Sequence, residues 1–291
     1  MNISPITNFY TKKPNFTSTR RTEYYLNPDS KNTGDTFVSE IYDPNNFSVK
    51  NSNVSVFFRE DIEDDVMCNW KDFVRKLYSA LPKDEKINIY DFASSDGSEA
   101  YSLIISLIET LGEKEAKRFL PIKAYDMDEG IVKRAKSNFI YADYEDIRRI
   151  EDYTGGKLDK YFYLAKEKNG DCLLLVRPIL SSNVEFQQAK IQDEVKNLNK
   201  PNSMIFARNM WKYLPLEDRI STFKELYNTM DDSSRIFLGD FDFRKSGTIA
   251  KVDPRSGALN GEFSCTILPP EGLREAGFKE STFPGQSFEK G

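Results

Sequence analysis

Hydrophobic and polar residues follow two different periods in the central part of the chain. Residues 87–91 alternate as in a short strand, and residues 100–111 carry the apolar repeat of a helix that ends at Gly112. Residues 122–125 predict a second strand and residues 129–138 a second helix. This strand, helix, strand order predicts parallel pairing with right-handed crossovers.

The later part of the chain contains a hairpin and then more alternating elements. Two β-rich runs, residues 161–166 and 172–177, flank Asn169-Gly170, a dipeptide that favours a tight hairpin turn. We therefore expect a small antiparallel excursion there. The elements expected after it are a buried strand at 203–207, a helix at 217–229, a strand at 235–239, a short helix at 272–276 and a strand at 278–283 that closes the sheet.

The N-terminal part of the chain has a different character. Residues 1–53 are polar and lack a sustained period, which predicts a loosely ordered arm. Acidic residues at 61–65 suit the start of a helix that runs to Ala80. The expected fold is a Rossmann-like α/β sheet with helices on both faces. The expected division is an arm at 1–53, a helical segment at 54–84, and a main domain at 85–291 with a β-subdomain at about 150–182.

The composition argues against nucleic-acid binding, membrane insertion and secretion. The chain has 41 Lys and Arg against 46 Asp and Glu, so no net positive field is available to hold nucleic acid. No run approaches the roughly 18 apolar residues that cross a bilayer, and residues 1–15 lack the apolar region of a secretory signal. We therefore expect a cytoplasmic protein without membrane insertion. Cys68, Cys172 and Cys265 are widely spaced and are interpreted as reduced packing residues. A monomer is expected, although no pattern fixes the oligomeric state.

The absence of histidine narrows the possible chemistry. The 291 residues include no His, which excludes Ser-His-Asp and Cys-His nucleophiles and histidine-containing metal sites, and no metal site is expected. A reaction here must use a nucleophile that is already ionised, or a base drawn from Asp, Glu, Lys or Tyr.

A candidate ligand loop lies between the first strand and the first helix. Its residues Ala93, Ser95 and Gly97 occupy the place where an open parallel sheet binds its ligand, but the loop has one glycine rather than three. A ligand without a pyrophosphate needs fewer glycines. One such ligand is S-adenosylmethionine, which presents an ammonium group and two ribose hydroxyls. Its site would need an acid near the loop and another at the end of the second strand, and Glu99 and Asp126 occupy these two positions.

Two alternatives apply to these acids. Asp128 is another candidate for the ribose contact, and Met127 beside it would also line the cofactor. Each acid also has a purely structural interpretation, because acids are common in the first turn of a helix and in ordinary turns.

Four stretches in order resemble the CheR-type protein-glutamate methyltransferases. The similarity covers roughly residues 54–242 and implies the class I methyltransferase form of the Rossmann-like sheet. The stretches are Val56-Phe57-Phe58-Arg59, Ala93 to Leu103, Ala124 to Asp128, and Ile205 to Tyr213.

The resemblance implies a role for several residues around the cofactor, S-adenosylmethionine. It places Gly97 and Glu99 near the methionine part and Asp126 on the ribose. Arg208 and Asn209 match an Arg-Asn pair beside the cofactor. Near the adenine, the family has Asn-Leu where this chain has Lys190 and Ile191, so adenine recognition differs in detail.

The resemblance also implies the reaction. Arg59 matches an arginine that orients the acceptor carboxylate, and Tyr213 matches a tyrosine near the transferred methyl. Surface ion pairing of Arg59 and a core role for the Tyr213 ring are the structural alternatives. A glutamate with a reference pKa of about 4.3 is already ionised at neutral pH and needs no general base, which agrees with the absence of histidine. The product would be S-adenosylhomocysteine.

The acceptor is less constrained than the cofactor. The family's acceptors are glutamates of receptor cytoplasmic domains, and some members capture a receptor tail by adding a strand to the small β-subdomain. In this chain a simple surface hairpin at Asn169-Gly170 is an equal alternative. Two other functions remain open: a methyltransferase for another protein or a small molecule, and a non-catalytic adapter with the same fold.

Overall fold

The computed structural model describes most of the chain from residue 57 onward. The described residues are 57–58, 70–168, 171–239, 242–247, 251–252, 259–260, 265–282 and 287–291. The expected arm at 1–53, the start of the first helix, Arg59 and the turn at Asn169-Gly170 lie outside them.

A seven-stranded sheet forms the centre of the fold and confirms the expected Rossmann-like α/β class. Its order is β13-β14-β8-β7-β1-β2-β6. The five strands from β8 to β6 run parallel, and β14 is antiparallel to both of its neighbours. The bounds are β1 Asn88–Phe92, β2 Ile122–Asp126, β6 Val184–Gln188, β7 Ser203–Ala207, β8 Arg235–Phe237, β13 Phe278–Glu280 and β14 Ser287–Lys290.

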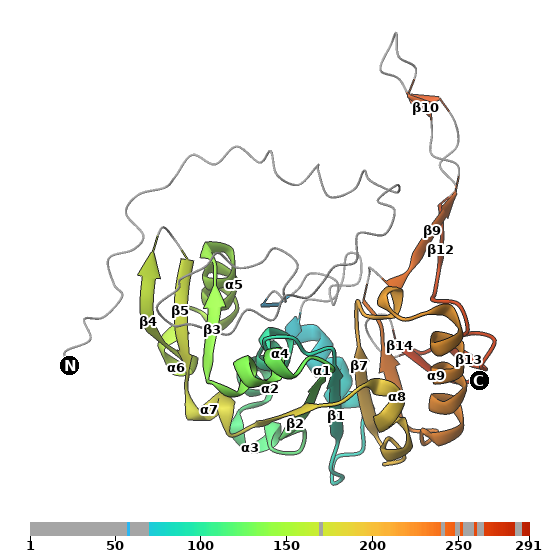
Figure 1. Ribbon diagram of the computed structural model, residues 1–291. Coiled ribbons are helices and arrows are strands. Elements are labelled where there is room, and N and C mark those ends of the chain that lie inside the picture. Colours follow the sequence, from blue (N-terminus) through green and yellow to red (C-terminus); the bar gives the residue numbers. More distant parts are fainter. Residues whose placement is uncertain are drawn as a thin grey trace. The chain divides into compact units, whose positions relative to one another are not determined.

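Helices cover the two faces of this sheet (Figure 1). On one face Phe73 of α1 meets Phe206 of β7 at 6.3 Å and Phe237 of β8 at 5.7 Å between ring centroids. On the other face Trp211 and Phe223 stack at 4.0 Å within a cluster that also buries Tyr90 and Phe92. The helices are α1 Trp70–Ala80, α2 Ser98–Leu111, α3 Glu113–Ala116 and α4 Glu129–Lys136, and, after the β-subdomain, α8 Ile191–Glu194, η2 Val195–Asn197, η3 Trp211–Tyr213 and α9 Leu216–Thr229.

A small antiparallel sheet lies between β2 and β6 in the sequence. The expected hairpin is confirmed as β4 and β5, and a third strand, β3, pairs with β5. Within this sheet β4 is an edge strand. This sheet starts before the expected bounds of about 150–182, because β3 belongs to it. From here on, β-subdomain means the elements β3 Phe139–Ala142, α5 Tyr144–Thr154, α6 Leu158–Tyr161, β4 Phe162–Lys168, β5 Asp171–Val176 and α7 Pro178–Ser181.

Glu109 on α2 joins the β-subdomain to the main sheet. Its carboxylate accepts hydrogen bonds from the hydroxyl of Tyr161 at 2.6 Å and from the ammonium groups of Lys160 at 2.8 Å and Lys157 at 3.1 Å. Burial works against the charge of Glu109, but these three donors outweigh it and lower its pKa to about 2. The position of the β-subdomain is therefore fixed by charge-assisted hydrogen bonds as well as by packing.

Phe57 and Phe58 are buried where α2 meets the β-subdomain. The backbone N–H of Phe57 donates to Asp146 of α5 at 3.2 Å, and that of Phe58 donates to Ser102 of α2 at 2.9 Å. The ring of Phe58 stacks on Tyr153 at 4.3 Å. The residues that come immediately before Arg59 are thus held by two elements.

The C-terminal part differs from the sequence-based expectation. The helix expected at 272–276 is wrong: the segment is a run of turns in which Gly272 and Gly277 have φ angles of 89° and 107°, far from helical values. The strand expected at 278–283 ends at residue 280 as β13, and β14 was not expected. Short hairpins precede them, namely β9 Arg244–Gly247 with β12 Cys265–Leu268, and β10 Lys251–Val252 with β11 Leu259–Asn260.

Within the described residues, no helix combines the length and apolar character needed to cross a membrane.

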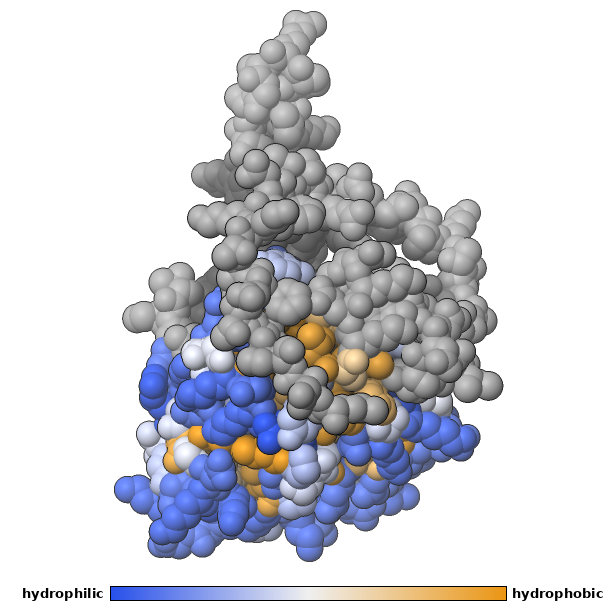
Figure 2. Space-filling view, turned by 90° about the vertical axis from the view of Figure 1, so that its left-hand side faces the viewer, coloured by the Kyte–Doolittle hydropathy of each residue, from blue (hydrophilic) through white to orange (hydrophobic). Residues whose placement is uncertain are grey.

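Figure 2 looks onto the β-subdomain side, where the described surface is mainly hydrophilic with smaller hydrophobic areas between. Tyr163 of β4 is one of the exposed aromatic residues, and the guanidinium of Arg177 lies 4.3 Å from its ring centroid.

Candidate cofactor-binding site

The expected site residues lie mainly at the carboxyl ends of β1, β2 and β7. The chain leaves β1 toward β2 and β6 and then returns to add β7 on the other side of β1. In an open parallel sheet, the crevice at such a reversal is where a ligand binds. The loop after β1, the turn after β2 and the Arg208-Asn209 pair after β7 all belong to this edge.

The loop after β1 has an unusual backbone. Ala93, Ser95 and Gly97 have φ angles of 57°, 50° and 91°, so three residues out of five adopt left-handed conformations. For the two that are not glycine this conformation is strained, and such strain persists where the surroundings impose it. The N–H of Ser94 donates to the carbonyl of Tyr125 at 2.9 Å, which fixes the loop to β2.

Asp126 organises the turn where β1 and β2 end. Its carboxylate accepts the backbone N–H of Ser95 at 3.0 Å and that of Asp128 at 3.0 Å. Burial raises the pKa of Asp126, while these backbone donors pull it down. Asp128 has a different task, since its carboxylate caps α4 by accepting the N–H of Ile131 at 3.0 Å. Met127 lies between them with 62% of its surface exposed.

Glu99 and Arg208 form a buried ion pair across the site. One guanidinium nitrogen of Arg208 lies 2.6 Å from the carboxylate of Glu99, and the two side chains are 1% and 15% exposed. Glu99 comes from the first turn of α2 and Arg208 follows β7, so the pair joins two of the three chain segments at this edge. The sequence-based expectation had placed both residues at the cofactor without foreseeing that they would bind each other.

Asp91 is a site residue that the sequence reasoning missed. It lies on β1 and is 1% exposed, and within the described residues no donor reaches its Oδ2 atom. Burial raises its pKa well above the usual range, the negative charge of Glu99 adds to this, and the positive charge of Arg208 opposes it. The signal was present in the sequence, because an acid inside an otherwise apolar central strand is unusual.

Asp242 was also missed, and it shapes the segment after β7. Its carboxylate accepts the backbone N–H groups of Asn209 at 2.6 Å, Trp211 at 3.0 Å and Gly239 at 3.0 Å. Asn209 is held with a φ of 60°, and its side chain packs so closely on Gly239 that a Cβ there would lie 2.2 Å from the amide oxygen. Nothing in the sequence separates Asp242 from a surface acid.

We expect Asp242→Asn to lower the free energy of unfolding by about 1–3 kcal/mol, because the new amide would turn a donor toward an N–H group. Burial raises the pKa of Asp242 to about 6. An acid whose folded-state pKa is raised contributes stability that is present below its unfolded pKa and is lost as pH rises through about 6. Urea unfolding at several pH values should show this fall in the wild type and not in the variant.

The control for this prediction is Asp152→Asn, which changes an acid on α5 that is 72% exposed. It should keep both the stability and the pH dependence of the wild type. An Asp242→Asn variant with the same pH profile as the wild type would contradict the role given to Asp242.

The remaining expected residues lie on the segments that follow β6 and β7. Tyr213, at the end of η3, is 60% exposed, and the ammonium of Lys212 lies 4.8 Å from its ring centroid. Lys190 is exposed at the N-terminus of α8, and Ile191 is buried in the core. The N–H of Ala189 donates to the carbonyl of Asp126 at 3.0 Å, so this segment does begin beside the turn after β2.

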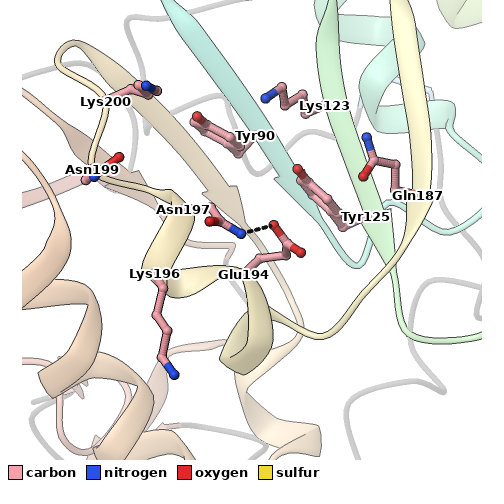
Figure 3. A pocket seen from close by; sticks show the side chains of 9 residues that line it. All are labelled: Tyr90, Lys123, Tyr125, Gln187, Glu194, Lys196, Asn197, Asn199 and Lys200. Atoms are coloured by element: carbon pink, nitrogen blue, oxygen red, sulfur yellow. Dashed lines mark hydrogen bonds between the residues drawn. The ribbon is translucent and has the colours of Figure 1, made fainter.

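A separate hollow opens between strands β1 and β2 and the segment around η2 (Figure 3). It measures about 490 Å³, and Tyr90 and Tyr125 form part of its wall together with Lys123 and Glu194. None of the expected cofactor residues lines it. We therefore do not assign the cofactor to this hollow.

The residues at the strand ends fit a small ligand that carries positive charge and hydroxyl groups. The acids Asp91, Glu99 and Asp126 outnumber the one guanidinium of Arg208, and an oxygen of Asp91 has no donor from the described residues. A side chain at position 97 would collide with Phe186, so the backbone there is kept bare. S-adenosylmethionine offers an ammonium, a sulfonium and two ribose hydroxyls to such a set.

The sheet is that of a Rossmann-like methyltransferase domain, and acidic side chains gather at its strand ends. A match to a family model identifies the family within this class of domain. The chain belongs to the family described as CheR methyltransferase, SAM binding domain, whose model matches residues 53–248.

Individual relatives agree with this family. Chemotaxis protein methyltransferase 2 of Vibrio cholerae serotype O1 is 27% identical over 157 residues, which are 53% of this chain and 51% of the relative. Chemotaxis protein methyltransferase of Klebsiella aerogenes is 27% identical over 171 residues, 58% of this chain and 53% of the relative. The chain thus spans about half the length of these relatives.

Among solved structures, a TehB-like SAM-dependent methyltransferase from Corynebacterium glutamicum matches with a TM-score of 0.34 and 11% identity. The match covers 75% of this chain and 87% of that one.

Proposed function

We propose that this protein transfers the methyl group of S-adenosylmethionine to glutamate carboxylates of a protein acceptor, of the kind found in the cytoplasmic part of chemotaxis receptors. The observation that carries the proposal is the buried Glu99–Arg208 pair beside the loop that Asp126 holds, in a chain of the CheR family. The names of the relatives support this acceptor class.

In this proposal the cofactor lies across the ends of β1, β2 and β7. Asp126 would accept hydrogen bonds from the ribose hydroxyls, and Glu99 would face the methionine part beside the bare backbone at Gly97. Asn209, held in its left-handed conformation by Asp242, would lie beside the cofactor. When bound, the cofactor supplies an electrophilic methyl group on a positively charged sulfur.

The acceptor carboxylate needs no base, because it is ionised at neutral pH, with a reference pKa of about 4.3. The task left to the protein is to hold this oxygen in line with the methyl group and to exclude water. We assign the orientation of the acceptor to Arg59 and the boundary of the methyl path to Tyr213, whose ring is exposed at the rim. The anchoring of Phe57 and Phe58 supports this role for Arg59, since it fixes the chain immediately before it.

The decisive experiment compares binding with turnover. We expect Asp126→Ala to weaken S-adenosylmethionine binding by about tenfold or more, because the loop loses its anchor and the ribose loses an acceptor. Arg59→Ala should leave cofactor affinity close to that of the wild type and lower turnover instead. Titration calorimetry measures the first effect, and transfer of a tritiated methyl group to receptor cytoplasmic fragments measures the second.

Glu129→Ala is the matched control, because Glu129 is an exposed acid three residues after Asp126 whose partner is the exposed Lys133. It should change neither quantity. Cofactor binding without transfer to any receptor fragment would favour the adapter or another acceptor. Wild-type affinity in Asp126→Ala would show that the ribose contact is assigned wrongly.

A further inference from the structure

Asp91 differs from Glu99 and Asp126 in that one of its carboxyl oxygens, Oδ2, accepts no hydrogen bond from the described residues. Glu99 is paired with Arg208 at 2.6 Å, and Asp126 accepts two backbone N–H groups at 3.0 Å. Within the described residues, nothing comparable reaches Oδ2 of Asp91, although its side chain is fully buried in the middle of the sheet.

The charged groups that face Asp91 come from three segments. Glu99 on α2 and Asp126 at the end of β2 are negative and raise the pKa of Asp91, as does the loss of water, while Arg208 after β7 lowers it. Loss of water is the largest of these effects. Asp91 therefore keeps its proton to a higher pH than an ordinary aspartate does.

The cofactor and its product differ by one positive charge. S-adenosylmethionine carries a sulfonium, an ammonium and a carboxylate, whereas S-adenosylhomocysteine has lost the sulfonium charge and is neutral overall. A charge that enters a buried site requires a counter-charge. Glu99 is already paired with Arg208, and the charge of Asp126 is supported by two backbone N–H donors, so we look to Asp91 to provide it by giving up a proton.

We propose that Asp91 releases its proton to solvent when S-adenosylmethionine binds and retains it when S-adenosylhomocysteine binds, so that this carboxyl distinguishes cofactor from product. The inference rests on the proposed function, since it requires this cofactor. After methyl transfer the sulfonium charge is gone, Asp91 takes a proton back from solvent, and the product is held without opposite-charge attraction.

Titration calorimetry in buffers with different enthalpies of ionisation, such as phosphate and Tris, counts the protons released. We expect the full chain to release protons on binding S-adenosylmethionine and none on binding S-adenosylhomocysteine. At pH values where the free protein still holds the Asp91 proton, affinity for S-adenosylmethionine should rise with pH, by up to about tenfold per unit, because one proton competes with one cation. Affinity for S-adenosylhomocysteine should stay constant.

Asp91→Asn mimics the protonated acid and should abolish both the proton release and the rise of affinity with pH. Asp152→Asn is the control, because Asp152 is an acid on α5 that is 72% exposed and belongs to no part of the candidate site. That variant should still release protons on binding S-adenosylmethionine.

Equal proton release with both ligands would overturn the proposal, as would no release with S-adenosylmethionine or continued release in Asp91→Asn. The comparison of the two ligands on the wild type tests the idea even if Asp91→Asn does not fold. Binding of neither ligand to the wild type would instead contradict the proposed function.

Discussion

Replacing Arg208 by Met is expected to remove cofactor binding and to lower the free energy of unfolding by about 3–5 kcal/mol, because it leaves a buried carboxylate without its partner. Arg208 is the only cation that the described residues bring into contact with Glu99, and its side chain is 1% exposed. Without it, the described residues would supply no positive charge beside Glu99 and Asp91. Urea unfolding and calorimetry with S-adenosylmethionine measure the two effects.

A second variant separates stability from binding. In the double variant Glu99→Gln with Arg208→Met, both charges are gone, so much of the lost stability should return while cofactor binding stays lost. Arg274→Ala breaks an ion pair whose two side chains are 56% and 72% exposed, and it should cost less than about 1 kcal/mol. If Arg208→Met were as mild as Arg274→Ala, the buried pair would not organise the site.

Replacing Gly97 by Val is expected to weaken cofactor binding by about a hundredfold or more, because the loop would have to move to relieve both a clash and backbone strain. A Cβ at this position would lie 2.6 Å from the ring of Phe186 and 3.1 Å from the ring of Tyr101, and Gly97 has a φ of 91°. Calorimetry with S-adenosylmethionine measures the effect, and circular dichroism reports whether the fold is kept.

Gly112→Val is the matched control for the Gly97 prediction. Gly112 also has a positive φ, 80°, but no atom lies within 4 Å of a Cβ there. This variant should therefore be destabilised by strain alone, by about 1–3 kcal/mol, and should bind the cofactor normally. Equal loss of binding in both variants would mean that the effect comes from general destabilisation and not from the close packing of the loop around Gly97.

The parallel core was predictable because its elements have strong and regular periods. The strand at 87–91, the helix at 100–111 and the strand at 203–207 correspond to β1, α2 and β7 within one or two residues. Apolar runs between turn signals mark buried parallel strands, and these were present. The sheet class followed from the order of the elements.

The elements that were missed had weak or conflicting signals. β6 has only two buried residues among five, so the alternation of apolar and polar residues that marks a strand extends over only a few positions. α5 carries a capping box, in which Asp143 and Asp146 accept each other's backbone N–H groups, and this signal could have been used. β14 is four residues long, and only its pairing with β8 and β13 makes it a strand.

The sequence predicted which described residues gather at the ends of β1, β2 and β7 better than it predicted the interactions they make. The order of strand ends placed Glu99 and Asp126 at the same edge, but the ion pair with Arg208 depends on residues 109 positions apart. The roles of Asp91 and Asp242 depend on which backbone groups and charges surround them after folding. No sequence pattern reports such surroundings.

The antiparallel strand β14 delays completion of the sheet while the chain is being synthesised. β14 pairs with β8 and β13 and so lies inside the sheet, although it is the latest of the described strands in the sequence. While the ribosome is still adding residues 287–290, β8 keeps one unpaired edge that another nascent chain could join. The vulnerable interval for aggregation should therefore extend until those residues have left the ribosomal exit tunnel.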